Sequence, residues 1–177
     1  MKHMRWYLVL GVLSGAISGC NCAGREFTVS KTFSVTQGSE DAVCASRSKT
    51  INLQDDSAFN SLKGNIGKVE LRKVVVAIVN PKTRDDSVAT TGHGTVSVKG
   101  SSEGSVVAQL GTYADVPIAV GSSQDIAFDA GAANALSSLA LNPPNTFDIV
   151  VEGCSDKNVA FYDFRVDLTF YAEVKLF

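Results

Sequence analysis

Residues Tyr162–Leu176, close to the end of the chain, read YDFRVDLTFYAEVKL. Apolar and polar side chains alternate along the whole stretch, beginning with Tyr162 and Phe164 on one side and Asp163 and Arg165 on the other. Because successive side chains of a β-strand point to opposite faces, the pattern predicts a long strand with one face on a core and one in water. A sheet with one solvated face is usually antiparallel, so we expect an antiparallel sheet.

Shorter alternating segments fill the rest of the chain. The expected strands cover residues 26–36, 42–53, 68–80, 96–98, 106–110, 116–120, 126–128 and 147–151. Two short helices are expected over 57–63 and 131–140, and Pro143-Pro144 ends the second one. Eight or nine short strands separated by turns predict an all-β fold, an antiparallel immunoglobulin-like β-sandwich with one or two short helices.

The segment 68–80 carries two more specific expectations. Val74–Val79 is apolar without interruption, which is typical of a strand covered on both faces. Arg72-Lys73 interrupts the alternation that Val69 and Leu71 begin, so we expect a β-bulge there.

Length and composition indicate one globular domain. The chain has 177 residues, 45% hydrophobic and 19% charged, which suits a single domain with its own core. The formal net charge is −2 and no cluster of basic residues is present. Because phosphate contacts depend on such clusters, the sequence argues against nucleic acid as a partner.

The first twenty residues have the organisation of an export signal. Lys2 and Arg5 precede an apolar run, Trp6–Ile17, that is shorter than the roughly 20 residues a bilayer span needs. The run ends in Ile17-Ser18-Gly19-Cys20, which resembles the lipobox of bacterial lipoproteins. That resemblance implies cleavage before Cys20, lipidation of its thiol and an anchor of several acyl chains. An ordinary secretory signal with an incidental cysteine is the alternative.

The resulting division of the chain is residues 1–19 as a cleaved signal peptide, 20–25 as a lipidated cysteine with a short tether, and 26–177 as one β-sandwich domain. By resemblance to enterobacterial lipoproteins, Asn21 permits transfer to the outer membrane. We therefore expect a lipid-anchored protein of the bacterial cell envelope at the outer membrane, with the membrane and an envelope protein as its partners.

Three cysteines follow Cys20. In an oxidising compartment cysteine pairs persist, and Cys44 and Cys154 both lie in or beside predicted strands, so we expect a disulfide between them. This disulfide would close a loop of about 110 residues. In the chain-entropy model it would stabilise the folded state by roughly 4–5 kcal/mol. Cys22 could replace either one, pair between molecules or stay free.

Catalytic residues, cofactors and metal ligands are not predicted. His93, between two glycines, lacks the orienting acid and activated serine of a Ser–His–Asp relay, and we interpret it as a loop residue. The acid pairs, such as Asp55-Asp56, have no calcium-loop spacing.

The sequence suggests one surface for binding. Phe161, Tyr171 and Phe177 fall on the outward side of the last strand or at its end and form a candidate binding patch; the alternative is that a loop or helix covers them. The expected role is a structural or protein-interaction subunit without catalysis. The alternative is a small-ligand or glycan-binding module of the periplasm or cell surface, and a hydrolase is a third hypothesis.

Overall fold

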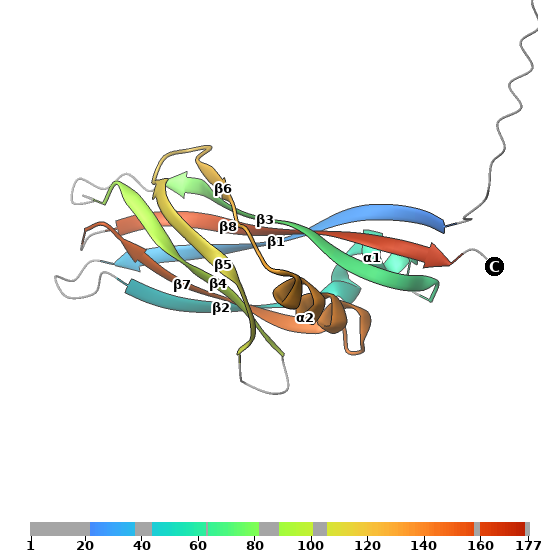
Figure 1. The fold of residues 1–177 in the computed structure, drawn as a ribbon. Coiled ribbons are helices and arrows are strands. Elements are labelled where there is room, and N and C mark those ends of the chain that lie inside the picture. Colours follow the sequence, from blue (N-terminus) through green and yellow to red (C-terminus); the bar gives the residue numbers. More distant parts are fainter. Residues whose placement is uncertain are drawn as a thin grey trace, which may run out of the picture.

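Two β-sheets face each other as the two layers of the molecule (Figure 1). The computed structural model describes residues 22–37, 44–62, 64–81, 89–100, 106–157 and 160–175. The first sheet contains, in spatial order, β1 (Cys22–Gln37), β8 (Ala160–Lys175), β3 (Ile66–Pro81) and β6 (Ser123–Asp125). The second contains β2 (Cys44–Asn52), β7 (Thr146–Ser155), β4 (Thr91–Gly100) and β5 (Val106–Pro117).

The strands pair as one long hairpin that has been rolled up. β1 pairs with β8, β2 with β7, β3 with β6, and β4 with β5, all antiparallel. Rolling brings β3 against β8 and β4 against β7 as well. This is the strand order of a double-sheet jelly roll. The predicted antiparallel β-sandwich with short helices is confirmed, and the strand order specifies its topology.

β8 lies between β1 and β3 and supplies the centre of the core. Six of its inward side chains are 3% exposed or less: Tyr162, Phe164, Val166, Leu168, Phe170 and Ala172. The ring of Phe170 stacks on Phe27 of β1, with 5.4 Å between ring centroids, and Phe164 stacks on Phe33 at 5.2 Å. Each such apolar side chain contributes about 1.5–3 kcal/mol by its burial, so β8 holds the first sheet onto the second.

Of the two expectations for residues 68–80, which form most of β3, one is confirmed. The register between β3 and β8 shifts between Leu71 and Lys73, which is the predicted bulge. The expectation that Val74–Val79 is covered on both faces is wrong, because burial alternates there: Val74 and Val76 are buried, whereas Val75 is only half-buried. The outward residues Val75, Ala77 and Val79 are only half-buried, so the outer face of this sheet is not fully covered here.

Both predicted helices are present, and each begins at an aspartate. In α1 (Ser57–Leu62) the Asp56 carboxylate accepts a hydrogen bond from the Phe59 N–H at 2.9 Å. In α2 (Ala130–Leu141) Asp129 accepts from the Ala132 N–H at 2.6 Å. These bonds satisfy N–H groups that have no partner inside the helix. Among the described residues, neither helix is long and apolar enough to cross a membrane.

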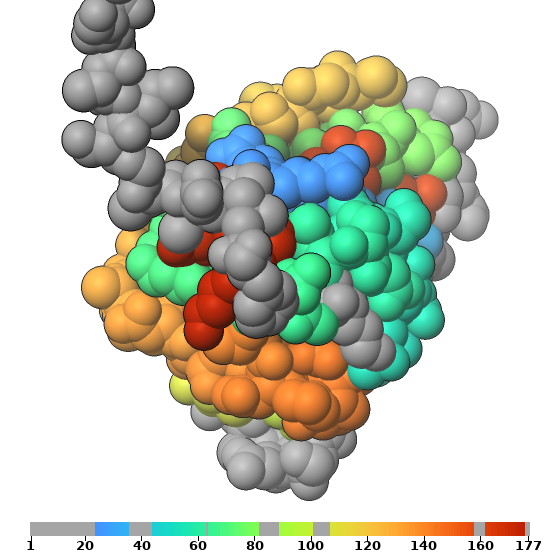
Figure 2. Space-filling view, turned by 90° about the vertical axis from the view of Figure 1, so that its right-hand side faces the viewer, coloured from blue at the N-terminus to red at the C-terminus, as the bar shows by residue number. Residues whose placement is uncertain are grey.

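The helices lie toward one end of the sandwich. Figure 2 looks onto this end, where the teal segment that contains α1 and the orange segment that contains α2 flank the red end of β8. A 3-10 turn, η1 (Leu53–Asp55), connects β2 to α1. The other end of the sandwich, where β4 begins and β7 ends, is free of helices in the described residues (Figure 1).

Two strand boundaries differ from expectation. β1 begins at Cys22, so Cys22–Arg25 pair with β8 instead of forming a tether. β5 continues to Pro117 and contains the expected separate strand at Val116, whereas Val120 lies in the following turn and is 78% exposed. The continuation is possible because Asp115 adopts a positive φ of 51°, at a bulge that re-aims the strand.

Replacing Phe170 with alanine should lower the free energy of unfolding by about 3–5 kcal/mol, because the ring is fully buried and its removal leaves a cavity. The neighbouring outward residue offers the control: Thr169→Ala should cost less than about 1 kcal/mol. Urea unfolding followed by circular dichroism measures both. Equal losses for the two variants would contradict the assignment of the inward face.

Candidate functional site

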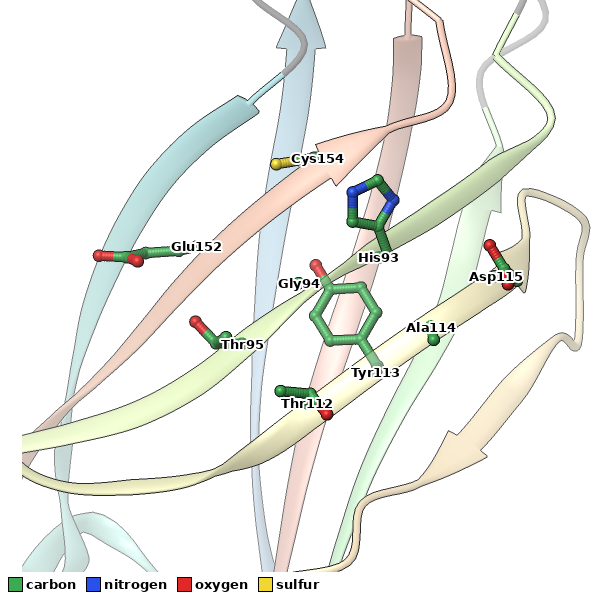
Figure 3. A pocket seen from close by; sticks show the side chains of 9 residues that line it. All are labelled: His93, Gly94, Thr95, Thr112, Tyr113, Ala114, Asp115, Glu152 and Cys154. Atoms are coloured by element: carbon green, nitrogen blue, oxygen red, sulfur yellow. The ribbon is translucent and has the colours of Figure 1, made fainter.

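A groove of about 610 Å³ lies across β7, β4 and β5 on the second sheet (Figure 3). It lies at the end of the sandwich that carries no described helix. Its lining combines a histidine, two carboxylates, two threonines, a tyrosine and a half-cystine: His93, Gly94, Thr95, Thr112, Tyr113, Ala114, Asp115, Glu152 and Cys154. We take this groove as the candidate site because it gathers the polar groups of three strands.

Strand register determines which side chains share the outer face. Cys44 of β2, Cys154 of β7 and His93 of β4 are direct cross-strand partners and form one row. Glu152 and Thr95 belong to the next row. Directly opposite residues of antiparallel strands project from the same face, with Cβ atoms about 4.5–5.5 Å apart. The imidazole, the disulfide and the Glu152 carboxylate therefore lie on the same surface.

A bulge in β5 supplies the far wall of the groove. The register between β4 and β5 passes from Gly92–Val116 to Gly94–Tyr113, so two β5 residues, Ala114 and Asp115, lie opposite His93. The positive φ of Asp115 belongs to this bulge. Bulges re-aim side chains and are frequent beside functional sites.

Tyr113 points inward below the groove and lies over glycine backbone. The side chain is 5% exposed, and Figure 3 shows its hydroxyl beside Gly94. A Cβ atom at Gly153 would lie 2.5 Å from this hydroxyl oxygen, and one at Gly94 would lie 2.7 Å from it. A Cβ at Gly94 would also overlap the Glu152 carbonyl oxygen. The absence of side chains at Gly94 and Gly153 therefore makes room for the phenol.

A second tyrosine hydroxyl lies nearby. A Cβ atom at Gly92 would lie 3.1 Å from the hydroxyl of Tyr162, on β8. Burial raises the pKa of Tyr162 to about 12. Burial, and then the neighbouring Tyr162, raise the pKa of Tyr113 above its ordinary value. Both phenols are therefore neutral at physiological pH.

Asp156 ties the end of β7 to the start of β4. Its carboxylate accepts hydrogen bonds from the Thr90 N–H at 2.8 Å, the Thr90 hydroxyl at 2.7 Å and the Thr91 N–H at 3.1 Å. Burial opposes the charge, but these hydrogen bonds outweigh it and lower the pKa of Asp156 below its usual value. The charged carboxylate therefore stabilises the end of the sandwich that carries the groove.

The structure contains the Cys44–Cys154 disulfide, with an S–S distance of 2.06 Å. A second groove of about 300 Å³ runs beside it and is lined by Cys44, Ala45, Ser46, Glu152, Gly153 and Cys154. The two grooves share Glu152 and Cys154, so the disulfide lies between them.

The other residues singled out by sequence are dispersed. His93 lies within β4 and is exposed, so its assignment to a loop is wrong. Tyr171 is half-buried on the outer face of β8; its ring covers Gly24, and the Arg72 guanidinium lies 5.0 Å from the ring centroid. The Phe161 side chain and Phe177 lie outside the described residues, so the binding patch stays a prediction. Cys20 and the signal segment lie outside them too.

Sequence reasoning did not single out Tyr113, Gly153 or Asp156 as functional residues. One signal was available: Gly92 and Gly94 are two apart and therefore face the same side of a strand, which indicates a large side chain opposite them. Within the described ranges no group of three or more histidine, cysteine or acidic side chains is arranged to hold a metal ion.

Comparison with known proteins gives matches of fold only. No protein-family model and no curated protein matches the chain. Among solved structures, a decameric BFDV capsid protein is similar at 11% identity over 85% of this chain and 99% of that chain, with a TM-score of 0.45. A Desmodium yellow mottle tymovirus structure is similar at 9% identity over 100% of this chain and 95% of that chain, with a TM-score of 0.35. A structure of turnip yellow mosaic virus is similar at 12% identity over 100% of this chain and 92% of that chain, with a TM-score of 0.31.

On this finding, several predictions are corrected. The reported structures are virus particles and capsid proteins, so the prediction of a lipid-anchored bacterial envelope subunit, or of a ligand- or glycan-binding envelope module, is wrong. The outer-membrane localisation and the membrane and envelope-protein partners are corrected with it. The physical reason is that these inferences came from the first twenty residues, which carry no information on how the domain's strands are ordered.

Gly153→Ala should cost about 1–3 kcal/mol in the free energy of unfolding, since its Cβ meets the Tyr113 hydroxyl. In a Tyr113→Phe background the hydroxyl is gone and the next side-chain atom, Cζ of Tyr113, is 3.8 Å away, so the same substitution should cost much less. A double-mutant cycle by urea unfolding measures the coupling. Additive costs would show that the hydroxyl does not occupy this space.

The Asp156 contribution should depend on pH. Because its folded pKa is lowered, the carboxylate contributes stability above the unfolded-state pKa near 4, and this contribution is lost as the pH falls through the folded value. Asp156→Asn should therefore destabilise the protein at pH 7 and flatten the loss of stability below about pH 5. Thr90→Val, which removes one donor, should reproduce part of this effect in urea titrations. An unchanged acid profile in Asp156→Asn would refute the assignment.

Proposed function

We propose that the chain is a non-enzymatic structural protein whose jelly-roll domain associates with copies of itself. The observation that supports this most directly is the strand order, β1-β8-β3-β6 against β2-β7-β4-β5. Jelly rolls with this organisation are used in viral capsids, lectins and cupins. Cupins and lectins exercise their function at a bound metal or ligand, whereas a shell subunit requires only surfaces that fit copies of itself.

The chemistry of the described residues favours the structural use. They contain no metal-binding cluster. The tyrosines beneath the groove are uncharged at physiological pH. The carboxylates of the groove, Glu152 and Asp115, come from different strands, β7 and β5, separated by β4. These features support assigning the domain a role that depends on shape.

The free edge of β1 is the surface we propose for association. Within the described residues only β8 is hydrogen-bonded to β1, along all of Cys22–Gln37, and β1 contains no proline. Such an edge presents unpaired N–H and C=O groups to a second strand. The edge strand at the other side of this sheet, β6, has three residues and offers little to pair with.

The BFDV capsid proteins among the similar structures are a decamer and a 60-mer, respectively. Their assembly is a property of those proteins. For this chain the proposal depends on its own strand order and on the free edge of β1.

The test is the oligomeric state of the full chain over a wide range of protein concentration, measured by light scattering after gel filtration and by electron microscopy. We expect closed oligomers that dissociate on dilution. The double variant Ser30→Lys and Thr32→Lys places like charges on the β1 edge of both partners and should weaken association by about 1–2 kcal/mol, roughly tenfold. Asn134→Lys, which adds charge on the exposed face of α2, is the matched control. A monomer at every concentration would overturn the proposal.

A further inference from the structure

The Cys44–Cys154 disulfide lies at an accessible position on the second sheet. Cys44 is exposed and Cys154 half-buried. Apart from Glu152, the neighbours of the bond along the groove are small, namely Ala45, Ser46 and Gly153. Exposure is one of the properties that make a disulfide open to exchange.

The position of the bond at a sheet edge leaves one line of approach open. Attack on a disulfide sulfur occurs from the side opposite the sulfur that leaves, along the S–S axis. Cys44 belongs to β2, the edge strand of its sheet, with β7 on one side and no described strand on the other. A nucleophile can therefore reach the Cys44 sulfur from beyond the edge. The equivalent approach to Cys154 leads across β4, where His93 lies.

We propose that this disulfide is a site of thiol–disulfide exchange with low-molecular-weight thiols. The thiolate of the external thiol attacks Sγ of Cys44, a new S–S bond forms between them, and the Cys44–Cys154 bond breaks. The electron pair of that bond leaves on Sγ of Cys154, which takes up a proton. A second thiolate then displaces Cys44, so that both cysteines are reduced and two external thiols are oxidised to one disulfide.

His93 is placed to supply the proton. It is the direct cross-strand partner of Cys154, so its imidazole projects from the same face as the leaving sulfur. The charged groups that face this row are Glu152 on β7 and Asp115 on β5, while the outward residues of β2 near it, Cys44 and Ser46, carry no charge. His93 acts here as a positioned proton donor.

Exchange should leave the sandwich folded. The ladder between β2 and β7 continues from the disulfide for eight further residue pairs, down to Asn52 and Thr146. Ile51, near the far end of β2, is 2% exposed and anchors the strand in the core. Reduction therefore frees only the beginning of β2.

The experiment exposes the native full chain to reduced glutathione, stops the reaction with iodoacetamide and maps the products by peptide mass. Trypsin separates the cysteines, because Cys44 falls in residues 32–47, Cys154 in 100–157, and Cys20 and Cys22 in 6–25. We expect the reaction rate to rise in proportion to glutathione concentration without a plateau, and the first adduct to appear on Cys44. A rate that levels off at the global unfolding rate, or an adduct first on Cys154, would overturn the proposal.

Two variants test the assigned roles. His93→Gln should slow the release of the Cys154 thiol by roughly tenfold below pH 7 and have less effect at pH 9, a change in pH profile that a purely structural role would not produce. Cys22→Ser should react at the wild-type rate, which shows that this cysteine is not the attacking thiol. An unchanged pH profile in His93→Gln would remove the histidine from the mechanism, and a slower Cys22→Ser variant would overturn attack by the external thiol.

Discussion

The structure depends on the register of β8 against its two neighbours. β8 pairs antiparallel with β1 along its whole length and with β3 through three register shifts. A slip of one residue would turn every inward aromatic of β8 toward water and every outward charge toward the core. The stacked pairs Phe27–Phe170 and Phe33–Phe164 exist only in the observed register. Burial therefore selects one pairing of three strands, and the second sheet packs against the result.

In the second sheet, glycines make room for buried tyrosine side chains. At the end of the sandwich that carries the groove, two tyrosines point inward, and large rings there leave no room for Cβ atoms on the facing strands. Gly94 and Gly153 provide that room. In this part of the second sheet the inward face carries uncharged side chains. His93, Glu152 and the disulfide lie on the outward face. The two faces of one sheet thus carry different chemistry because their side chains alternate.

The disulfide connects β2, the edge strand of this sheet, to its neighbour β7. Cys44 and Cys154 are 110 positions apart in sequence, so the bond restricts the unfolded chain considerably and stabilises the fold by about 4–5 kcal/mol in the chain-entropy model. In the folded protein, however, it lies at an exposed edge among small residues. The contribution of the disulfide to stability and its accessibility to thiols follow from the same position. The nine residue pairs of the β2–β7 ladder keep the two strands together when the disulfide is reduced.

The sequence by itself determined the fold class, the inward face of β8, both helices and the bulge near Arg72, because these depend on local periodicity and on capping residues. It also suggested the pair Cys44 and Cys154. Only the tertiary structure decided the jelly-roll order, the meeting of Cys154 with His93 and the placement of Tyr113 over Gly153. Those features depend on which strand lies beside which, and the side-chain alternation of a strand is the same whatever its partner. The apolar run Val74–Val79 shows the limit: it indicated cover on both faces, but cover depends on which layers pack against the sheet, and burial alternates along the run.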